Sequence, residues 1–238
     1  MSCGGSGDPP TDPKVELNNQ VRMAQGYLRS GRTAQAATAI EAAIKLDPKN
    51  AGLQNFYGQV LFLMGRHTES EAAYDKALEL DPYLTDAHNN RGALYAETGR
   101  PAKAEQEYLQ ALVDNSYPTP QKVYFNLGML YATQGRDEDA VSKLRKAVEI
   151  EREYYQAHYE LAGVLDRLGK LEEAASEYEV ALPGYRGSGE YHYRLGFVYF
   201  RLGNATRATP ELQRVLDLAP GSESAVRASE LLKVIGQS

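Results

Sequence analysis

Small and large apolar residues recur along the chain in a pattern that appears six times, each time around a glycine. Small residues stand seven positions before that glycine, and large residues stand nine positions after it. The small residues are Ala24, Gly58, Gly92, Gly128, Ala162 and Gly196, and the large ones are Ile40, Tyr74, Tyr108, Leu144, Tyr178 and Leu212. Apolar positions at such spacings indicate amphipathic helices. The pattern predicts two helices per repeat, whose backbones approach closely at the small residues.

The glycine at the centre of each copy sets the period of the pattern. These glycines are Gly31, Gly65, Gly99, Gly135, Gly169 and Gly203, at intervals of 34, 34, 36, 34 and 34 residues. A 34-residue period resembles that of the tetratricopeptide repeat (TPR), which is one helix–turn–helix unit. One such unit cannot bury its own apolar face, so neighbouring units must stack. We therefore expect an all-α fold: a right-handed superhelix (α-solenoid) of six TPR units with a concave groove.

The repeats also predict how the chain is divided. We expect a flexible segment over 1–13, repeats within 14–221 at about 17–50, 51–84, 85–120, 121–154, 155–188 and 189–221, and a capping helix within 222–238. The interval of 36 reflects two extra residues within 114–120, which form either a longer surface loop or a feature with a function, namely a partner contact or a family marker. Pro183, Gly184, Gly187 and Gly189 predict an interruption in the second helix of repeat 5, which is either a tolerated irregularity or a hinge.

Composition and motif searches exclude several classes of function. The net charge of −6 argues against nucleic-acid binding, which needs a basic surface. We find no nucleotide-binding loop, no dinucleotide motif and no nucleophile elbow, and one cysteine with four scattered histidines suggests no metal site. We therefore expect no enzyme activity, no cofactor and no small-molecule substrate. His88, His158 and His192 share one repeat position, eleven before the turn glycine, which favours a structural role.

The first helix of each TPR unit lines the groove with residues thirteen, ten, six and three positions before the turn glycine. The partner-binding residues that we predict are Asn55, Gln59, Phe62, Asn89, Phe125, Met129, Tyr159, Tyr193, Phe197 and Phe200. Three of them, Tyr193, Phe197 and Phe200, lie on one helix face and would suit a partner helix or strand. The alternative is that the capping helix covers Phe197 and Phe200. Lys122 is almost the only basic residue at these positions, which disfavours an acidic peptide as ligand.

Cys3 begins a segment rich in glycine and proline and poor in apolar residues, which cannot pack. It resembles the lipid-modified cysteine of bacterial lipoproteins, with the small Ser2 before it. Gly4 after it, where aspartate would signal retention, implies sorting to the outer membrane. No export signal precedes Cys3, and we expect the start methionine to stand in its place. The alternative is an unmodified cysteine in a cytosolic tail.

One junction resembles a specific family. Ala111-Leu112-Val113-Asp114-Asn115-Ser116-Tyr117-Pro118 is followed by Val123-Tyr124-Phe125-Asn126-Leu127-Gly128. With the six repeats and Cys3, these residues resemble the secretin pilotins of type IV pili, called PilF, PilW or Tgl, and most of all Tgl. The resemblance implies a lipid-anchored protein on the periplasmic face of the outer membrane. It would bind secretin (PilQ-type) subunits and promote their assembly, which pilus extension and motility require.

Two other functions remain open at this point. One is a BamD-like assembly lipoprotein for outer-membrane barrels in general, although such proteins usually have five repeats. The other is a cytosolic TPR scaffold or co-chaperone in which Cys3 has no role. Each would bind protein rather than catalyse a reaction.

Overall fold

The computed structural model describes residues 12–113 and 117–237, and every regular element in these residues is a helix. The chain forms two compact units, Met1–Tyr117 and Pro118–Ser238. Cys3 and residues 114–116 of the junction with the insertion lie outside the described residues. Within the described part, the helical-hairpin array that the sequence predicts, an all-α solenoid, is confirmed.

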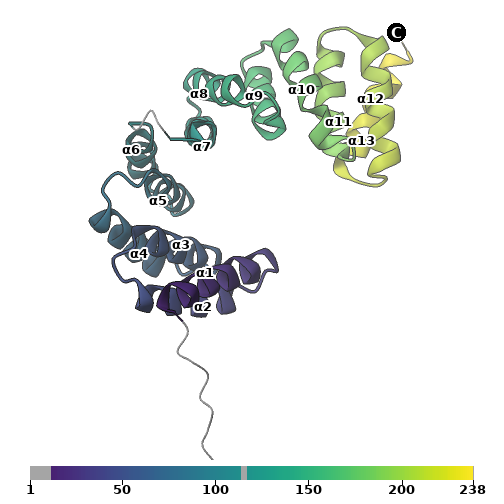
Figure 1. The fold of residues 1–238 in the computed structure, drawn as a ribbon. Helices are drawn as coiled ribbons and strands as arrows, with labels where there is room; N and C mark the ends of the chain where they lie inside the picture. Colours follow the sequence, from purple (N-terminus) through teal and green to yellow (C-terminus); the bar gives the residue numbers. More distant parts are fainter. Residues whose placement is uncertain (1–11, 114–116, 238) are drawn as a thin grey trace, which may run out of the picture. The chain divides into compact units, whose positions relative to one another are not determined.

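Each unit is a series of helical hairpins in chain order (Figure 1). The first unit holds α1 (Pro13–Arg29), α2 (Thr33–Leu46), α3 (Ala51–Leu63), α4 (His67–Leu80), α5 (Thr85–Glu97) and α6 (Pro101–Ala111). The second unit holds α7 (Pro120–Thr133), α8 (Asp137–Ile150), α9 (Tyr155–Arg167), α10 (Leu171–Tyr185), α11 (Gly189–Arg201), α12 (Ala205–Leu218) and α13 (Glu223–Ile235). We call the odd-numbered helix of each pair its helix A and the even-numbered one its helix B.

The six repeat glycines form the turns between helix A and helix B. Each has a positive φ of 71–73°, a conformation that only glycine adopts without strain. At Gly65 the turn closes when the Gly65 N–H donates to the Phe62 carbonyl and the Arg66 N–H donates to the Leu61 carbonyl. These bonds satisfy carbonyls that the end of α3 would otherwise leave unpaired. The glycine period is therefore the period of the turns.

The small residues of helix A lie against the large residues of helix B, as the sequence pattern predicts. A Cβ on Gly92 would lie 2.7 Å from Cε1 of Tyr108, and one on Gly128 would lie 2.7 Å from Cγ of Leu144. The large partners are buried, because Tyr108 is 2% exposed and Leu144 is fully covered. Because the glycines have no side chain, the large side chains of helix B can occupy the space beside them.

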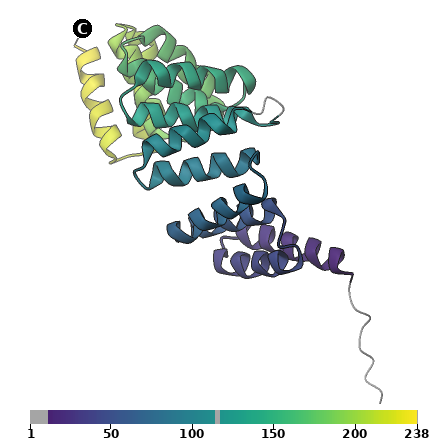
Figure 2. The same cartoon turned by 90° about the vertical axis from the view of Figure 1, so that its left-hand side faces the viewer.

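The second unit ends with α13, which packs along α12 and α11 (Figures 1 and 2). Ser222 caps it by accepting a hydrogen bond from the Ala225 N–H, at 3.1 Å. Ala225 and Ala228 form its buried face. The helix therefore covers apolar surface on the last hairpin and leaves its own outer face to solvent.

The predicted interruption of repeat 5 is wrong, because α10 continues through Pro183 and Gly184 to Tyr185. The Tyr185 ring stacks on Tyr159, with centroids 4.6 Å apart, and lies parallel to the ring of Tyr191 at 5.8 Å. Both rings belong to neighbouring A helices. This stacking holds the last turn of α10 despite the missing N–H of the proline.

Candidate functional site

In the first unit, the predicted partner-binding residues lie on α3 and α5 with different exposures. Gln59 is exposed, whereas Asn55, Phe62 and Asn89 are half-buried. Asn55 Oδ1 accepts a hydrogen bond of 3.0 Å from Asn90 Nδ2, which ties α3 to α5. The Phe62 ring packs edge-on against His67, at 5.7 Å between centroids. This face offers a partner mainly amide groups and part of one ring.

In the second unit, α11 presents the aromatic residues that the sequence predicts. Tyr193, Phe197 and Phe200 are all half-buried, so α13 does not fully cover them. The rings of Tyr193 and Phe197 are stacked with centroids 6.0 Å apart, and the Arg201 guanidinium lies 5.8 Å from the centroid of Phe197. We call Tyr193, Phe197 and Phe200 the α11 aromatic face. Partly exposed, mutually packed rings next to a cation are typical of a protein-binding surface.

Three further predicted residues, on α7 and α9, contribute less. Phe125 is only 9% exposed and packs against Tyr154, with 5.2 Å between ring centroids, so most of its surface is unavailable to a partner. Tyr159 is half-buried within the tyrosine stack, and Arg194 lies 5.7 Å from its ring centroid. Met129 is half-buried on α7. Among the predicted residues, all of which lie in the described part of the chain, ring stacking joins only Tyr193 and Phe197 to each other.

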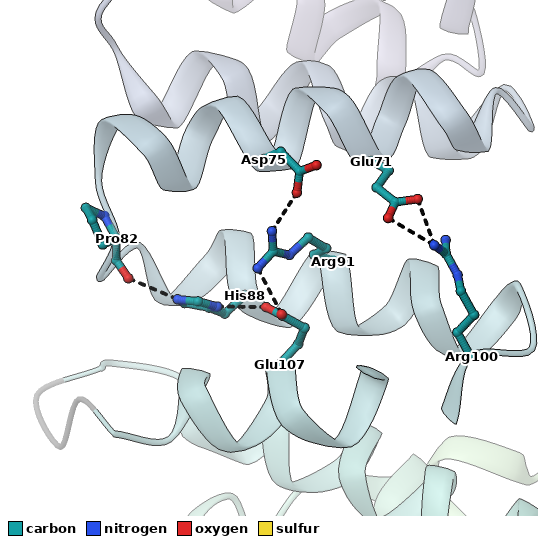
Figure 3. Close-up of polar contacts among 7 residues, drawn as sticks. All are labelled: Glu71, Asp75, Pro82, His88, Arg91, Arg100 and Glu107. Atoms are coloured by element: carbon teal, nitrogen blue, oxygen red, sulfur yellow. Dashed lines mark hydrogen bonds and ion pairs between the residues drawn. The ribbon is translucent and has the colours of Figure 1, made fainter. Parts of the chain in front are cut away.

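Repeat 3 contains a charged network that the sequence did not single out (Figure 3). Glu107 of α6 is 7% exposed and points toward α5. Its Oε1 accepts from Arg91 Nη2 at 2.8 Å, and its Oε2 lies 2.8 Å from His88 Nδ1. Arg91 also donates through Nη1 to Oδ1 of Asp75 on α4, at 2.6 Å. A single guanidinium therefore links α4, α5 and α6.

The environment of Glu107 shifts the acid–base balance of the network. Burial by itself raises the pKa of Glu107, but the hydrogen bonds from His88 and Arg91 outweigh burial and hold that pKa below its usual value. The hydrogen bond to Glu107 raises the pKa of His88, against the opposing effects of burial and of the Arg91 charge. Both pKa shifts favour the ionised form of Glu107 and the protonated form of His88. The network therefore stabilises the hairpin and does not create a reactive group.

A second ion pair lies beside this network, also between adjacent repeats. Arg100 Nη1 donates to both carboxylate oxygens of Glu71 on α4, at 2.9 and 2.8 Å (Figure 3). The Arg100 guanidinium also lies 4.4 Å from the centroid of the Tyr95 ring. The basic residue after the turn glycine has the same position over a tyrosine in repeats 1 and 4, through Arg32 on Tyr27 and Arg136 on Tyr131. These contacts explain why arginine so often follows the glycine.

The three histidines at the shared repeat position have matching partners. The Nδ1 atoms of His88, His158 and His192 lie 2.8, 2.5 and 2.6 Å from carboxylate oxygens of helix B. Those carboxylates belong to Glu107, Glu177 and Glu211, each nineteen residues after its histidine. The contacts support the structural role that the sequence favours. A signal for the partners was present, because glutamate stands eight positions after the turn glycine only in the repeats that have the histidine.

Two surface pockets of the described residues lie apart from the α11 aromatic face. One, of about 370 Å³, lies between α10, α11 and α12, where Leu182, Tyr199 and Pro210 form part of its lining. Another, of about 360 Å³, lies between α1 and α2 and is lined by uncharged side chains that include Met23 and Tyr27. Neither contains a residue that we predicted to bind a partner.

The described residues were also considered as a metal site and as membrane-spanning helices, and they provide neither. No group of three or more histidine, cysteine, aspartate or glutamate side chains there could hold a metal ion. Among the helices of the described part, none combines the length and apolar character that crossing a membrane requires.

Solved structures of other proteins share this fold along almost the whole chain. PilF from Pseudomonas aeruginosa is 22% identical with a TM-score of 0.82, over 92% of this chain and 98% of that one. PilW, described as a widely conserved type IV pilus biogenesis factor, is 25% identical with a TM-score of 0.77, over the same shares. YrrB, described as a TPR protein with an unusual peptide-binding site, is 24% identical with a TM-score of 0.67, over 82% of this chain and 99% of that one.

Sequence comparison gives the family. The curated proteins include no sequence that matches this chain. Models of the tetratricopeptide repeat match residues 21–84 and 125–189, residues 73–106 and residues 189–222. The first of these models alone covers more than half of the chain, and the helical hairpins with their turn glycines lie in the matched segments. The chain therefore belongs to the tetratricopeptide repeat family.

Proposed function

We propose that this TPR protein is a secretin pilotin of type IV pili, a non-catalytic scaffold anchored in the outer membrane through a lipid on Cys3. It binds secretin subunits and promotes their assembly into the pilus channel. The observation that carries the proposal is the similarity to PilF and PilW along 92% of this chain and 98% of each of theirs. The closer likeness to Tgl remains a prediction.

The α11 aromatic face is the binding surface that we assign to the client. Tyr193, Phe197 and Phe200 offer apolar area, and the stacking of Tyr193 on Phe197 already orders two of the three rings, so binding costs little side-chain entropy there. Arg201, which forms an ion pair with Asp166, places a charge at the edge of this area. A lipid anchor raises the local concentration of the protein near membrane-bound secretin, which strengthens a modest contact.

Junction residue Tyr117, one of the residues that resemble the pilotin family, has a structural contact. Its hydroxyl donates to Oδ1 of Asp86 on α5, at 2.5 Å. The bond fastens the chain after α6 back onto its own unit. We infer that the Tyr-Pro pair contributes to the conformation of this junction rather than to client binding.

A secretin assembly assay tests the proposal. The protein, as encoded by its own gene, is expressed in cells that lack it, and heat-resistant secretin multimers are quantified in boiled and unboiled membranes. We expect Cys3→Ala and the double variant Tyr193→Ala/Phe197→Ala each to reduce the multimer. Tyr83→Ala is the matched control, because Tyr83 is 82% exposed and lies in the loop after α4.

The outcomes separate the alternatives. Equal multimer formation with and without the protein would exclude a pilotin. Loss of outer-membrane barrels in general, rather than of secretin alone, would indicate a BamD-like role. Recovery of the full-length protein as an unlipidated cytoplasmic pool would indicate a cytosolic scaffold. The double variant must retain the wild-type melting temperature, so that loss of the multimer reports binding and not unfolding.

A further inference from the structure

Repeats 3, 5 and 6 each hold a histidine ring between two oxygen atoms. On one side Nδ1 faces a glutamate of helix B, as described above. On the other side Nε2 faces a backbone carbonyl of the preceding loop. The carbonyls belong to Pro82, Arg152 and Arg186, at 3.0, 3.1 and 3.1 Å. We call each arrangement a histidine bridge, because it joins helix A, helix B and the loop before them.

The chemistry of the partners determines the protonation of these rings. An ionised carboxylate and a backbone carbonyl can only accept hydrogen bonds. A neutral imidazole has one N–H, so it can donate to one of the two oxygens and must turn a lone pair toward the other. Only the imidazolium form donates to both. The geometry of the bridge therefore matches the protonated ring.

In repeat 3, the charges that act on the His88 ring are those of Glu107 and Arg91, and they oppose each other. His158 is 8% exposed and His192 is 4% exposed, so solvent screens them little. Arg91 lies beside His88, but its guanidinium is bonded to Glu107 and Asp75. Around the other two rings, the ion pairs recorded are those with Glu177 and Glu211, and the Tyr191 ring packs edge-on against His192. Each ring thus has one dominant carboxylate partner.

The sequence of the repeats links the two side chains of the bridge. At the histidine position, repeats 1, 2 and 4 carry Gln20, Gln54 and Tyr124. At the glutamate position, the same repeats carry Ala39, Ala73 and Lys143. No repeat has the histidine without the glutamate, or the glutamate without the histidine. A residue that served only to fill space would not need this particular partner.

We propose that the histidine bridges of His88, His158 and His192 are a pH-dependent lock, which holds repeats 3, 5 and 6 closed while the rings are protonated and loosens when they lose the proton. Deprotonation removes one hydrogen bond and the charge–charge attraction from each bridge. The helix A–helix B contact and the loop before it then have less to hold them together. Repeats 1, 2 and 4 lack the lock.

The sign of the effect follows from the shifted groups in repeat 3. The pKa of His88 is raised, so its bridge contributes fully below the unfolded histidine value of about 6.5 and is lost as pH rises through the folded value. The pKa of Glu107 is lowered, so its contribution is lost only in acid, below the unfolded glutamate value of about 4.3. The bridge is therefore strongest in mildly acidic solution and weakens toward alkaline pH.

Nitrogen NMR of the imidazole rings in the wild-type protein tests the protonation directly. We expect the His88 ring, whose pKa the hydrogen bond to Glu107 raises, to stay doubly protonated above the unfolded histidine value of about 6.5. If the His88 ring has already lost a proton below that value, the proposal is overturned.

A second experiment measures the consequence for stability. The melting temperature of the wild type is compared, from about pH 6 to about pH 9, with that of the triple variant His88→Gln/His158→Gln/His192→Gln. Glutamine is the matched replacement because it occupies this position in repeats 1 and 2 and does not titrate. We expect the wild type to lose several degrees more than the variant over this range, and His67→Gln to behave as wild type. Parallel curves for the wild type and the triple variant would contradict the lock.

Discussion

Gly92 and Tyr108 face each other across the hairpin of repeat 3, and no atom can be added between them. By contrast, the nearest atom to a Cβ on Gly163 of α9 would be the Tyr178 hydroxyl, at 3.6 Å, an ordinary contact. The two glycines lie in equivalent helices, but only one is required by packing. Substitution of a glycine in helix A is therefore expected to have different effects on stability at different positions.

Alanine substitutions at these two positions are expected to have opposite effects. Gly92→Ala should destabilise the protein by about 1–3 kcal/mol, because the buried Tyr108 ring must move. Gly163→Ala should stabilise it by up to about 1 kcal/mol, because alanine has the higher helix propensity and the space is open. Urea unfolding of both variants measures the change. Two changes of the same sign would contradict the packing described here.

Glu107 provides a prediction about charge at the same scale. Glu107→Ala should cost about 3 kcal/mol, at the low end of the range for breaking a buried ion pair because Arg91 keeps Asp75. Gln106→Ala, at the exposed neighbouring position of α6, is the control and should have little effect. Thermal unfolding of the two variants provides the comparison, and a Glu107→Ala protein as stable as the control would show that the network contributes nothing.

The sequence alone predicted the columns of small and large residues but not the partners of the charges. Gly92 and Tyr108 could be paired because their spacing recurs in every repeat. Arg91, Asp75 and Glu107 could not, because their network occurs in repeat 3 alone and joins three helices. Phe125 could be placed on the correct helix face, but its burial under Tyr154 depends on a neighbour that the spacing rule does not include.

At the scale of the element, α10 shows how tertiary contacts override local preference. Pro183 and Gly184 are poor helix formers, and the sequence predicted a break there. The helix continues because Tyr185 stacks with Tyr159 and Tyr191, two rings of other helices. That stacking connects residues that are far apart in the sequence, so it could not be read from the local composition.

Removing this ring should therefore release the end of α10. Tyr185→Ala should cost about 1–2 kcal/mol through the lost stacking on two rings. Hydrogen exchange should become faster in the last turn of α10 and in the loop before α11, with other helices little changed. Tyr83→Ala is the control. Unchanged exchange in this segment would mean that the tyrosines do not hold the helix end.

At the scale of the whole molecule, stability depends on contacts between successive hairpins and on how the stack ends. The last hairpin of the second unit is covered by α13, whose Ala228 is fully buried while Val226 is 56% exposed. The sequence predicted a capping helix from its amphipathic pattern. Its register against α11 and α12 became known only from the structure.

The cap can be tested by placing the same residue on its two faces. Ala228→Arg should destabilise the protein by about 2–4 kcal/mol, because the side chain must either displace α13 or be buried without a partner. Val226→Arg, on the outer face, should leave stability almost unchanged. Calorimetry compares the two, and equal effects would show that α13 is not docked as described.

The loop carbonyl in each histidine bridge has a consequence for building chimeric arrays. The imidazole and the carboxylate lie within one repeat, but the third atom is supplied by the segment that leads into it. If repeats were exchanged with a crossover at the start of helix A, the imidazole and the carboxylate would be transferred but the loop carbonyl would not. Recombination of these repeats should therefore succeed when the crossover lies upstream of Pro82, Arg152 or Arg186, so that the loop is transferred together with the hairpin that follows it.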